Sequence, residues 1–165
     1  MKIAICPGSY DPVTYGHLDI IKRSAVLVDK LIVTVFVNPS KKTSLFSIEE
    51  RLDMLRETTK DIPNVEVDTS TGLLNVYAAS KNCHLLIRGL RAFSDFEYEF
   101  QRALMIKKID PTLETAFFMT DGRYSYLSST GVRELAYFNG DVSQMVPPYV
   151  CLLYTSPSPR DISGS

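Results

Sequence analysis

The distribution of apolar residues along the chain is the feature that most restricts how it folds. Short, nearly unbroken apolar runs, rich in β-branched residues and bounded by Pro, Gly or Asn, recur at residues 3–6, 31–37, 65–67, 84–87 and 115–119. Runs of this length without a polar face are typical of strands that are buried on both sides of a sheet. The pattern therefore predicts five buried strands.

Segments with helical periodicity lie between these strand candidates. The alternation of strand and helix predicts an α/β fold, with a Rossmann-like five-stranded parallel sheet and helices on both faces, in a single domain. Ligands of such folds bind beyond the carboxyl ends of the strands. The predicted helices begin near His17, at the capping boxes Ser47 with Glu50 and Ser94 with Glu97, at Leu74, and at Ser129 or Thr130.

The length and a change in composition set the domain boundaries. A chain of 165 residues suits one domain with a single buried core, which we expect to span residues 1–150. The composition changes near Pro147 and Pro148, and residues 155–165 are polar and rich in Pro and Ser. We expect residues 151–165 to form an atypical, disordered tail.

The charge balance restricts the partners of the protein. With 18 basic and 19 acidic residues, the net charge is −1, so the chain lacks the global positive field typical of nucleic-acid-binding proteins. The chain has no run of about 18 apolar residues, which is the length that a membrane span requires. The three cysteines are widely spaced, unlike a zinc site or a disulfide framework. We expect a cytoplasmic protein without nucleic acid or membrane partners.

The segment after the first predicted strand has residue types that suit phosphate binding. Residues 7–17 include two glycines and one of the two histidines, and they lead directly into a helix. Gly16 would let a phosphate approach the backbone, and His17 would lie at a helix start, where N–H groups favour anions. The alternative is a plain turn between strand and helix, with His17 as a capping residue.

Basic residues follow two further strands. Lys41 and Lys42 come after the second strand, either as a solvated loop or as a contact to an anion. Arg88 and Arg91 follow the fourth strand, and arginine binds phosphate through a bidentate fork. We therefore predict that anions are bound at this edge of the sheet.

Three hydroxyl residues, at positions 128–130, open the last predicted helix and would form a second phosphate cradle. An ordinary N-cap would explain one of them but not all three. Neither the Rossmann GxGxxG nor the Walker GxxxxGK[ST] pattern occurs. The chain is therefore expected to bind phosphates without either common glycine loop.

Two segments resemble the paired signatures of the nucleotidyltransferase α/β superfamily. Residues 14–17 resemble the first, usually written HxGH, and residues 128–133 resemble the second. Thr14 at the first position is the variant of the phosphopantetheine adenylyltransferases, to which residues 7–12, 40–42, 49–51, 86–91 and 95–99 are also similar. The resemblance covers residues 2–150 and implies transfer of the adenylyl group of ATP to 4′-phosphopantetheine, giving dephospho-coenzyme A and pyrophosphate.

The resemblance also implies roles for individual residues and assembly into a homohexamer. It implies that Mg²⁺ binds together with ATP, and it assigns no residue of the protein as a ligand of this ion. The implied catalytic residues are Ser9, His17, Lys41 and Arg91. The implied contacts to phosphopantetheine are Ser9, Lys41, Leu74 and Arg88. The implied contacts to ATP are Ser9, Tyr10, His17, Gly89, Leu90, Arg91, Glu99, Tyr124, Ser125, Tyr126, Leu127, Ser128, Ser129 and Thr130.

The implied reaction depends on alignment of two anions rather than on a base. A phosphate monoester is already anionic at pH 7, so direct in-line attack without a covalent intermediate needs positioning and charge stabilisation. Two other interpretations remain open from the sequence. One is another superfamily member, such as a nicotinate mononucleotide adenylyltransferase or a cytidylyltransferase. The other is a non-catalytic module that binds a nucleotide or coenzyme A.

Overall fold

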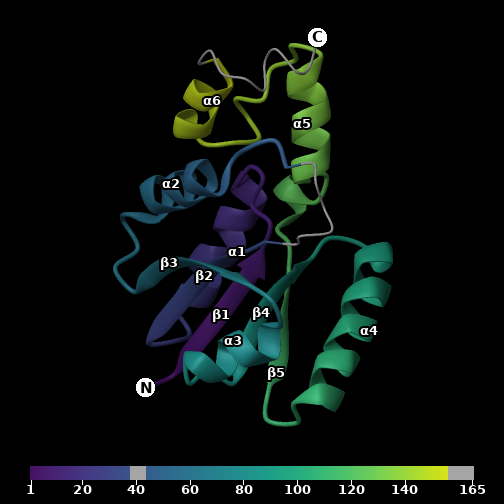
Figure 1. Ribbon diagram of the computed structural model, residues 1–165. Helices are drawn as coiled ribbons and strands as arrows, with labels where there is room; N and C mark the ends of the chain where they lie inside the picture. Colours follow the sequence, from purple (N-terminus) through teal and green to yellow (C-terminus); the bar gives the residue numbers. More distant parts are fainter. Residues whose placement is uncertain (38–43, 156–165) are drawn as a thin grey trace.

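The computed structural model describes residues 1–37 and 44–155, which form one parallel sheet covered by helices (Figure 1). The strands are β1 (Ile3–Gly8), β2 (Lys30–Val37), β3 (Val65–Thr71), β4 (Leu85–Leu90) and β5 (Glu114–Met119). The helices are α1 (Tyr15–Ala25), α2 (Ile48–Thr59), α3 (Leu74–Ser80), α4 (Phe93–Ile109), the 3-10 turn η1 (Gly122–Tyr124), α5 (Ser129–Tyr137) and α6 (Pro148–Thr155).

The strands are parallel and lie in the order β3-β2-β1-β4-β5. β2 and then β3 lie on one side of β1, and the chain then crosses the sheet so that β4 and β5 lie on the other side of β1. The strand order therefore reverses between β1 and β4, and ligands of such sheets bind at this switch point. The predicted α/β class and the five-stranded parallel sheet are confirmed.

Alternate residues of the central strands pack into two separate cores. Ala4 and Leu31 belong to the core that includes α1 and α2, whereas Ile5 and Ile32 belong to the core that includes α3 and α4. Because consecutive strand residues point to opposite sides of a sheet, helices cover both faces, as predicted. Burial on both sides explains why these strands read as nearly unbroken apolar runs.

One predicted capping box is confirmed and the other is wrong. Ser47 caps α2, where its hydroxyl accepts from the N–H of Glu50 at 3.1 Å and its own N–H donates to the Glu50 carboxylate at 3.0 Å. Helix α4 follows Ala92 as its N-cap and has no side-chain cap, although the sequence predicted a cap at Ser94. The carboxylate of Asp95 bonds backward to residue 91 instead, so the helix starts earlier.

The N-cap of α5 also lies one residue before the first of the predicted caps, Ser129 or Thr130. The N-cap is Ser128, whose Oγ accepts from the N–H of Gly131 at 3.0 Å. Ser129 was predicted as a possible cap, but its hydroxyl donates to the carbonyl of Pro12 at 2.8 Å. The three hydroxyl residues thus have different partners, and one of these bonds ties α5 to the loop after β1.

Helix α6 crosses the boundary that we predicted after residue 150. Val150 is fully buried, and the ring of Tyr154 meets that of Phe46 edge-on, with 5.1 Å between the ring centroids. The prediction of a disordered tail is therefore wrong for residues 151–155, because they continue α6, and Cys151, Leu153 and Tyr154 pack on the core. Residues 156–165 of the predicted tail lie outside the described residues.

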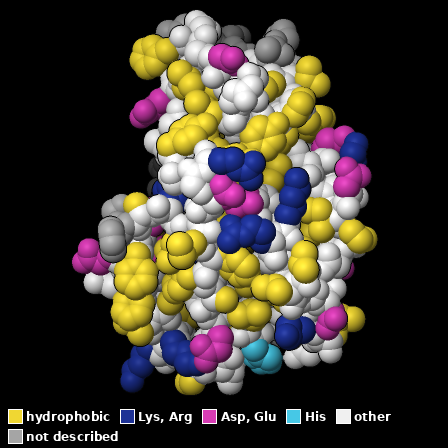
Figure 2. Space-filling view, turned by 180° about the vertical axis from the view of Figure 1, so that it is seen from behind, with side chains coloured by type: hydrophobic (Ala, Val, Ile, Leu, Met, Phe, Trp, Pro, Cys, Tyr) yellow, Lys and Arg dark blue, Asp and Glu magenta, His cyan; other side chains and the backbone are white. Residues whose placement is uncertain are grey.

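The longest helix, α4, has 17 residues and exposes many apolar side chains. Figure 2 shows hydrophobic side chains gathered over α4, which lies at the left of that view. None of the helices in residues 1–37 and 44–155 has both the length and the apolar character that a membrane span requires. The exposed apolar side chains of α4 are Phe96, Tyr98, Phe100, Leu104, Met105 and Ile109.

Candidate active site

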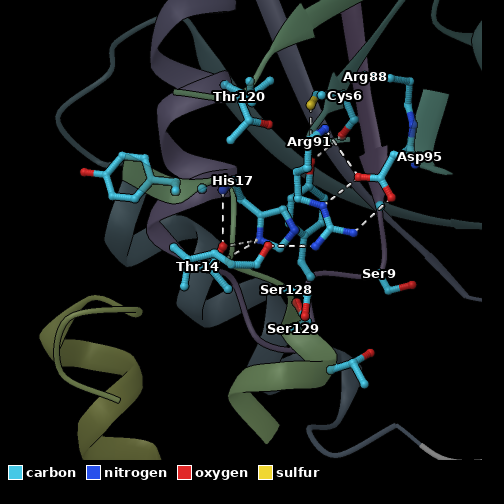
Figure 3. Close-up of a pocket in the computed structure, with 18 of the residues that line it drawn as sticks. Cys6, Ser9, Thr14, His17, Arg88, Arg91, Asp95, Thr120, Ser128 and Ser129 are labelled. Atoms are coloured by element: carbon cyan, nitrogen blue, oxygen red, sulfur yellow. Dashed lines mark hydrogen bonds and ion pairs between the residues drawn. The ribbon is translucent and has the colours of Figure 1, made fainter. Parts of the chain in front are cut away.

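A pocket of about 370 Å³ lies at the switch point, between the carboxyl ends of β1 and β4. Three parts of the chain form its walls: the loop from β1 into α1, the end of β4 with the start of α4, and the segment from the end of β5 to the start of α5 (Figure 3). The walls bring together one histidine, three arginines and several hydroxyl groups. This composition suits a polyanionic ligand.

His17 lies in the first turn of α1 and bonds with the residue that caps this helix. The backbone N–H of Thr14 donates to Nδ1 of His17 at 3.0 Å, and the N–H of His17 donates to Oγ1 of Thr14 at 3.3 Å. The histidine is therefore both a capping residue and a pocket residue, which joins the two alternatives that the sequence left open. Because Nδ1 accepts a backbone N–H, the ring proton is on Nε2.

The charge state of His17 follows from its surroundings. Burial, and then the positive charges of Arg88 and Arg91, lower the pKa of His17 from 6.5 to about 4. The ring is therefore neutral at pH 7, with one N–H group available on Nε2. Such a group donates a hydrogen bond, and it is poorly suited to act as a base because its second nitrogen already accepts one.

The residues under His17 hold the turn at the end of β1. Tyr10 has a left-handed backbone, with φ of 49°, and its buried hydroxyl donates to the carbonyl of Cys6 at 2.9 Å. The rings of Tyr10 and His17 meet edge-on, with centroids 4.9 Å apart. Tyr10 thus turns the backbone sharply and supports the imidazole from the side of the core.

Close packing at Gly89 brings β4 near α1. A Cβ atom at this position would lie 3.1 Å from Cγ1 of Ile20, which is closer than carbon atoms normally approach. The absence of a side chain therefore lets the floor of the pocket form from backbone.

Arg88 is held by a bidentate ion pair on the floor of the pocket. Its Nε and Nη2 donate to the two carboxylate oxygens of Glu99 at 2.9 and 2.6 Å, and its Nη1 donates to the carbonyl of Pro7 at 2.5 Å. The Glu99 side chain is 10 % exposed and that of Arg88 is 25 % exposed. Glu99 therefore fixes the guanidinium between β1 and α4, and its own oxygens are occupied by this pair.

Arg91 connects two walls of the pocket. Its Nε donates to the carboxylate of Asp95 at 2.8 Å, and its Nη1 donates to the carbonyl of Leu127 at 2.8 Å. The first contact joins the end of β4 to α4, and the second joins it to the segment before α5. The guanidinium lies near His17 at the pocket wall, as Figure 3 shows.

The comparisons with known proteins identify the family. The family model described as cytidylyltransferase-like matches residues 5–135. A phosphopantetheine adenylyltransferase of Caldanaerobacter subterraneus is 59 % identical over 150 residues, which cover 91 % of this chain and 93 % of the relative. One of Carboxydothermus hydrogenoformans is 55 % identical, with coverage of 91 % and 92 %. The chain belongs to the phosphopantetheine adenylyltransferases.

Solved structures support the fold of this adenylyltransferase. A putative nicotinate-nucleotide adenylyltransferase from Vibrio parahaemolyticus superposes with a TM-score of 0.68 at 18 % identity, covering 93 % of this chain and 91 % of the other. A bifunctional NMN adenylyltransferase/ADP ribose pyrophosphatase from Francisella tularensis, in complex with AMP and a manganese ion, gives 0.64 at 17 % identity, covering 88 % and 44 %. At these identities the likeness shows the shared fold alone.

Family membership confirms the reaction class expected from the sequence. The chain is a nucleotidyltransferase of coenzyme A biosynthesis, and its reaction is adenylyl transfer to phosphopantetheine. The interpretations as a nicotinate mononucleotide enzyme or as a non-catalytic module lose their support, because the close relatives share one name over nearly the whole chain.

Most site residues expected from the adenylyltransferase family lie together in the structure. Lys41 lies outside the described residues, and the pocket lining does not include Leu90, Ser125 or Tyr126. Leu74 borders a second, very small cavity that shares Arg88 and Glu99 with the main pocket. The expected residues that line the main pocket are Ser9, Tyr10, His17, Arg88, Gly89, Arg91, Glu99, Tyr124, Leu127, Ser128, Ser129 and Thr130.

The sequence analysis missed some residues that form the same walls. Thr120 follows β5 directly and lines the pocket, so its place at a strand end was the signal. Asp95 also lines the pocket, but its pairing with Arg91 depends on how α4 leaves the sheet. Asp11 lies behind the pocket rather than in its lining, and the sequence analysis included it only as part of a motif, although it is 4 % exposed and accepts two backbone hydrogen bonds.

Proposed function

We propose that this pocket aligns ATP and 4′-phosphopantetheine so that the pantetheine phosphate attacks the α-phosphorus of ATP directly, in line, without a covalent intermediate. The observation that carries the proposal is the neutral His17, held by Thr14 as an Nε2–H donor in a pocket that also contains Arg88 and Arg91. The nucleophile needs no deprotonation at pH 7, so a fixed donor is more useful than a base.

His17 and Ser9 would act on the α-phosphate. Nε2–H of His17 would donate to an oxygen that gains charge in the transition state, and the exposed Ser9 hydroxyl, in the loop before α1, would donate to the same group. Loss of one such donor commonly costs about 2.7–4 kcal/mol of activation free energy, or roughly a hundred- to a thousand-fold in turnover.

Arg91 and the start of α5 would bind the departing pyrophosphate. The first amides of a helix have no partners within the helix and favour anions, and Ser128, Ser129 and Thr130 place this helix start at the pocket. Mg²⁺ would enter as part of the MgATP substrate and neutralise phosphate charge. Both carboxylates of the pocket lining, Asp95 and Glu99, already bind arginines, so ATP and water suit this ion better as ligands.

The remaining ATP contacts are proposed from the family positions. Tyr10 supports His17, and Gly89 provides a backbone floor. Tyr124 and Leu127 line the pocket beside the start of α1, where the nucleoside would lie. Further contacts through Leu90, Ser125 and Tyr126 would require backbone groups, since the pocket lining leaves these residues out.

Lys41 would hold the incoming phosphate. The described residues on both sides of its segment support this proposal. Val37 ends β2, which is the neighbour of β1 in the sheet, and Leu45 donates its N–H to the carboxylate of Asp11, in the loop after β1. Both ends of the segment that contains Lys41 therefore adjoin β1 or the loop that follows it.

Leu74 and Arg88 would contact the pantetheine part of the second substrate. Both border the small cavity beside the main pocket, against the face of α4 that points to the sheet. Glu99, which the family resemblance assigned to ATP, would act in this site by orienting Arg88. We therefore expect its loss to affect phosphopantetheine more than ATP.

The proposal includes assembly of the protein into a homohexamer and a location in the cytoplasm. The exposed apolar side chains of α4, which include Phe100, Leu104 and Ile109, suit a contact between subunits. Such a contact would cover them. The number of six comes from the family resemblance.

The test of this function is release of pyrophosphate from ATP that depends on 4′-phosphopantetheine. We expect release with 4′-phosphopantetheine and none with nicotinate mononucleotide. His17→Ala should retain ATP binding by calorimetry and lose roughly a hundred- to a thousand-fold in turnover. The matched control is His84→Ala, at the only other histidine, which is exposed and remote from the pocket lining. Near-normal turnover of His17→Ala would exclude the proposed role.

A further inference from the structure

The backbone of the loop between β1 and α1 is held by side chains from two distant helices. Arg51 of α2 donates to the carbonyl of Ser9 at 3.1 Å. Arg133 of α5 donates to the carbonyl of Asp11 at 2.6 Å, and Ser129 donates to that of Pro12 at 2.8 Å. Three carbonyl groups within four residues are thus fixed from outside the loop, just before the segment that bears His17.

The carboxylate of Asp11 adds a contact to a third part of the chain. Its Oδ2 accepts from the N–H of Leu45 and its Oδ1 from the N–H of Phe46, both at 2.8 Å. The side chain of Phe46 is 1 % exposed and belongs to the main core, so this anchor is rigid. Arg133 lies 3.8 Å from Oδ2 and balances the buried charge.

Asp11 is itself 4 % exposed and is not part of the pocket lining. It therefore does not touch the reacting groups. It does connect three parts of the site and its surroundings: the loop that leads to His17, the buried residue Phe46 and, through Arg133, the start of α5. Arg133 also donates to Oγ1 of Thr130 at 3.2 Å, which extends this connection to the proposed pyrophosphate site.

We propose that Asp11 is a positioning residue for adenylyl transfer: it sets the place of the β1–α1 loop, and with it the first turn of α1 that bears His17, relative to the start of α5. This inference rests on the proposed role of His17. A misplacement of about 1 Å can cost roughly a hundred-fold in rate. The effect should therefore appear in turnover, because donor geometry matters most in the transition state.

The test is a double-mutant cycle with Asp11→Asn and His17→Ala. The carboxamide keeps the size of the side chain but turns an NH₂ group toward a backbone N–H and removes the charge near Arg133. We expect Asp11→Asn to lower kcat about 10- to 100-fold, with less than a threefold change in ATP affinity by calorimetry. In the His17→Ala background the same substitution should lower kcat less than about threefold, since both act through one group.

The cycle separates this inference from the function on which it rests. If His17→Ala turns over normally, the proposed function fails. If His17→Ala is slow but Asp11→Asn has equal effects in both backgrounds, or acts only through KM, Asp11 does not position His17 and the inference fails. Asp68→Asn is the matched control, because Asp68 also accepts a hydrogen bond and pairs with Lys81, but lies outside the pocket lining. It should leave kcat within about twofold.

A second variant allows the test to be made if Asp11→Asn does not fold. Should Asp11→Asn lack the circular dichroism spectrum of the parent protein, Arg133→Lys replaces it in the cycle. A lysine keeps the charge but cannot bond to the Asp11 carbonyl and Thr130 together. The same non-additivity with His17→Ala is expected, and additive effects would overturn the inference.

Discussion

The backbone N–H of Thr14 donates to Nδ1 of His17 at 3.0 Å. Because the donor belongs to the main chain, side-chain changes at position 14 leave it in place. The hydroxyl of Thr14 meanwhile accepts from the N–H of His17 and caps α1. Helix start and imidazole tautomer are therefore set by one local arrangement, which keeps the Nε2 proton available to the pocket.

This arrangement predicts how His17 responds to pH. Its pKa is lowered from 6.5 to about 4, chiefly by burial, so the neutral form should persist as the pH falls from 8 to about 5 and be lost only near pH 4. In the His84→Ala variant His17 is the only histidine, so ¹⁵N spectra of the ring can be assigned directly. We expect an Nε2–H tautomer throughout this range; titration near pH 6.5 would contradict the assignment.

The Arg88–Glu99 pair predicts a linked loss of stability and substrate affinity. Removal of one partner from a buried pair costs about 3–5 kcal/mol, and the partial exposure of Arg88 should reduce this to about 2–3 kcal/mol for Glu99→Gln. The KM for phosphopantetheine should rise at least about tenfold, because the guanidinium loses its orientation. Urea denaturation and steady-state kinetics measure the two effects.

The control for this prediction is Glu57→Gln. Glu57 pairs with Lys60 on the surface of α2, with side chains that are 44 % and 61 % exposed. Such pairs contribute little, so stability and KM should stay nearly unchanged. Equal losses in both variants would mean that the bidentate pair has no special role.

The architecture could be predicted because it depends on patterns within each segment. Strands buried on both faces require apolar runs, and the chain has five of them. The helix start at Ser47 was also predictable, since its capping box is complete within four residues. The start of α4 was not, because Asp95 bonds to Arg91, and this choice depends on how the strand before it leaves the sheet.

The site was predictable in its residue types and less so in its contacts. Histidine, arginine and hydroxyl residues at strand ends pointed to anions, and the strand order brought them together. The partners of Glu99 and Asp11 were not predictable. Their bonds join residues that are 11 and more than 30 positions apart, so no local spacing reveals them. The residue types alone did not specify the substrate, and phosphopantetheine was expected only because of the resemblance to the family.

The exposed face of α4 predicts an effect of charge on assembly. In Leu104→Glu a carboxylate would enter the proposed subunit contact, where an unpaired charge is costly. We expect the mass by light scattering to fall from about six times the 18.6 kDa chain to a smaller species. Leu27→Glu is the control, since Leu27 is 62 % exposed beyond the end of α1, against 55 % for Leu104. An unchanged mass of Leu104→Glu would remove α4 from the contact.

The packing of α6 predicts where the chain can be shortened. A protein of residues 1–150 loses Tyr154, whose ring packs on Phe46, and Leu153, which contacts the core. Loss of a fully buried large side chain costs about 2–5 kcal/mol, these two side chains are partly buried, and each kcal/mol lowers the Tm of a domain of this size by about 2–4 °C. Thermal unfolding of residues 1–150 should therefore begin several degrees below that of residues 1–155, whereas residues 1–155 should melt close to the full chain. A large loss on removing only residues 156–165 would show that the last ten residues contribute to the fold.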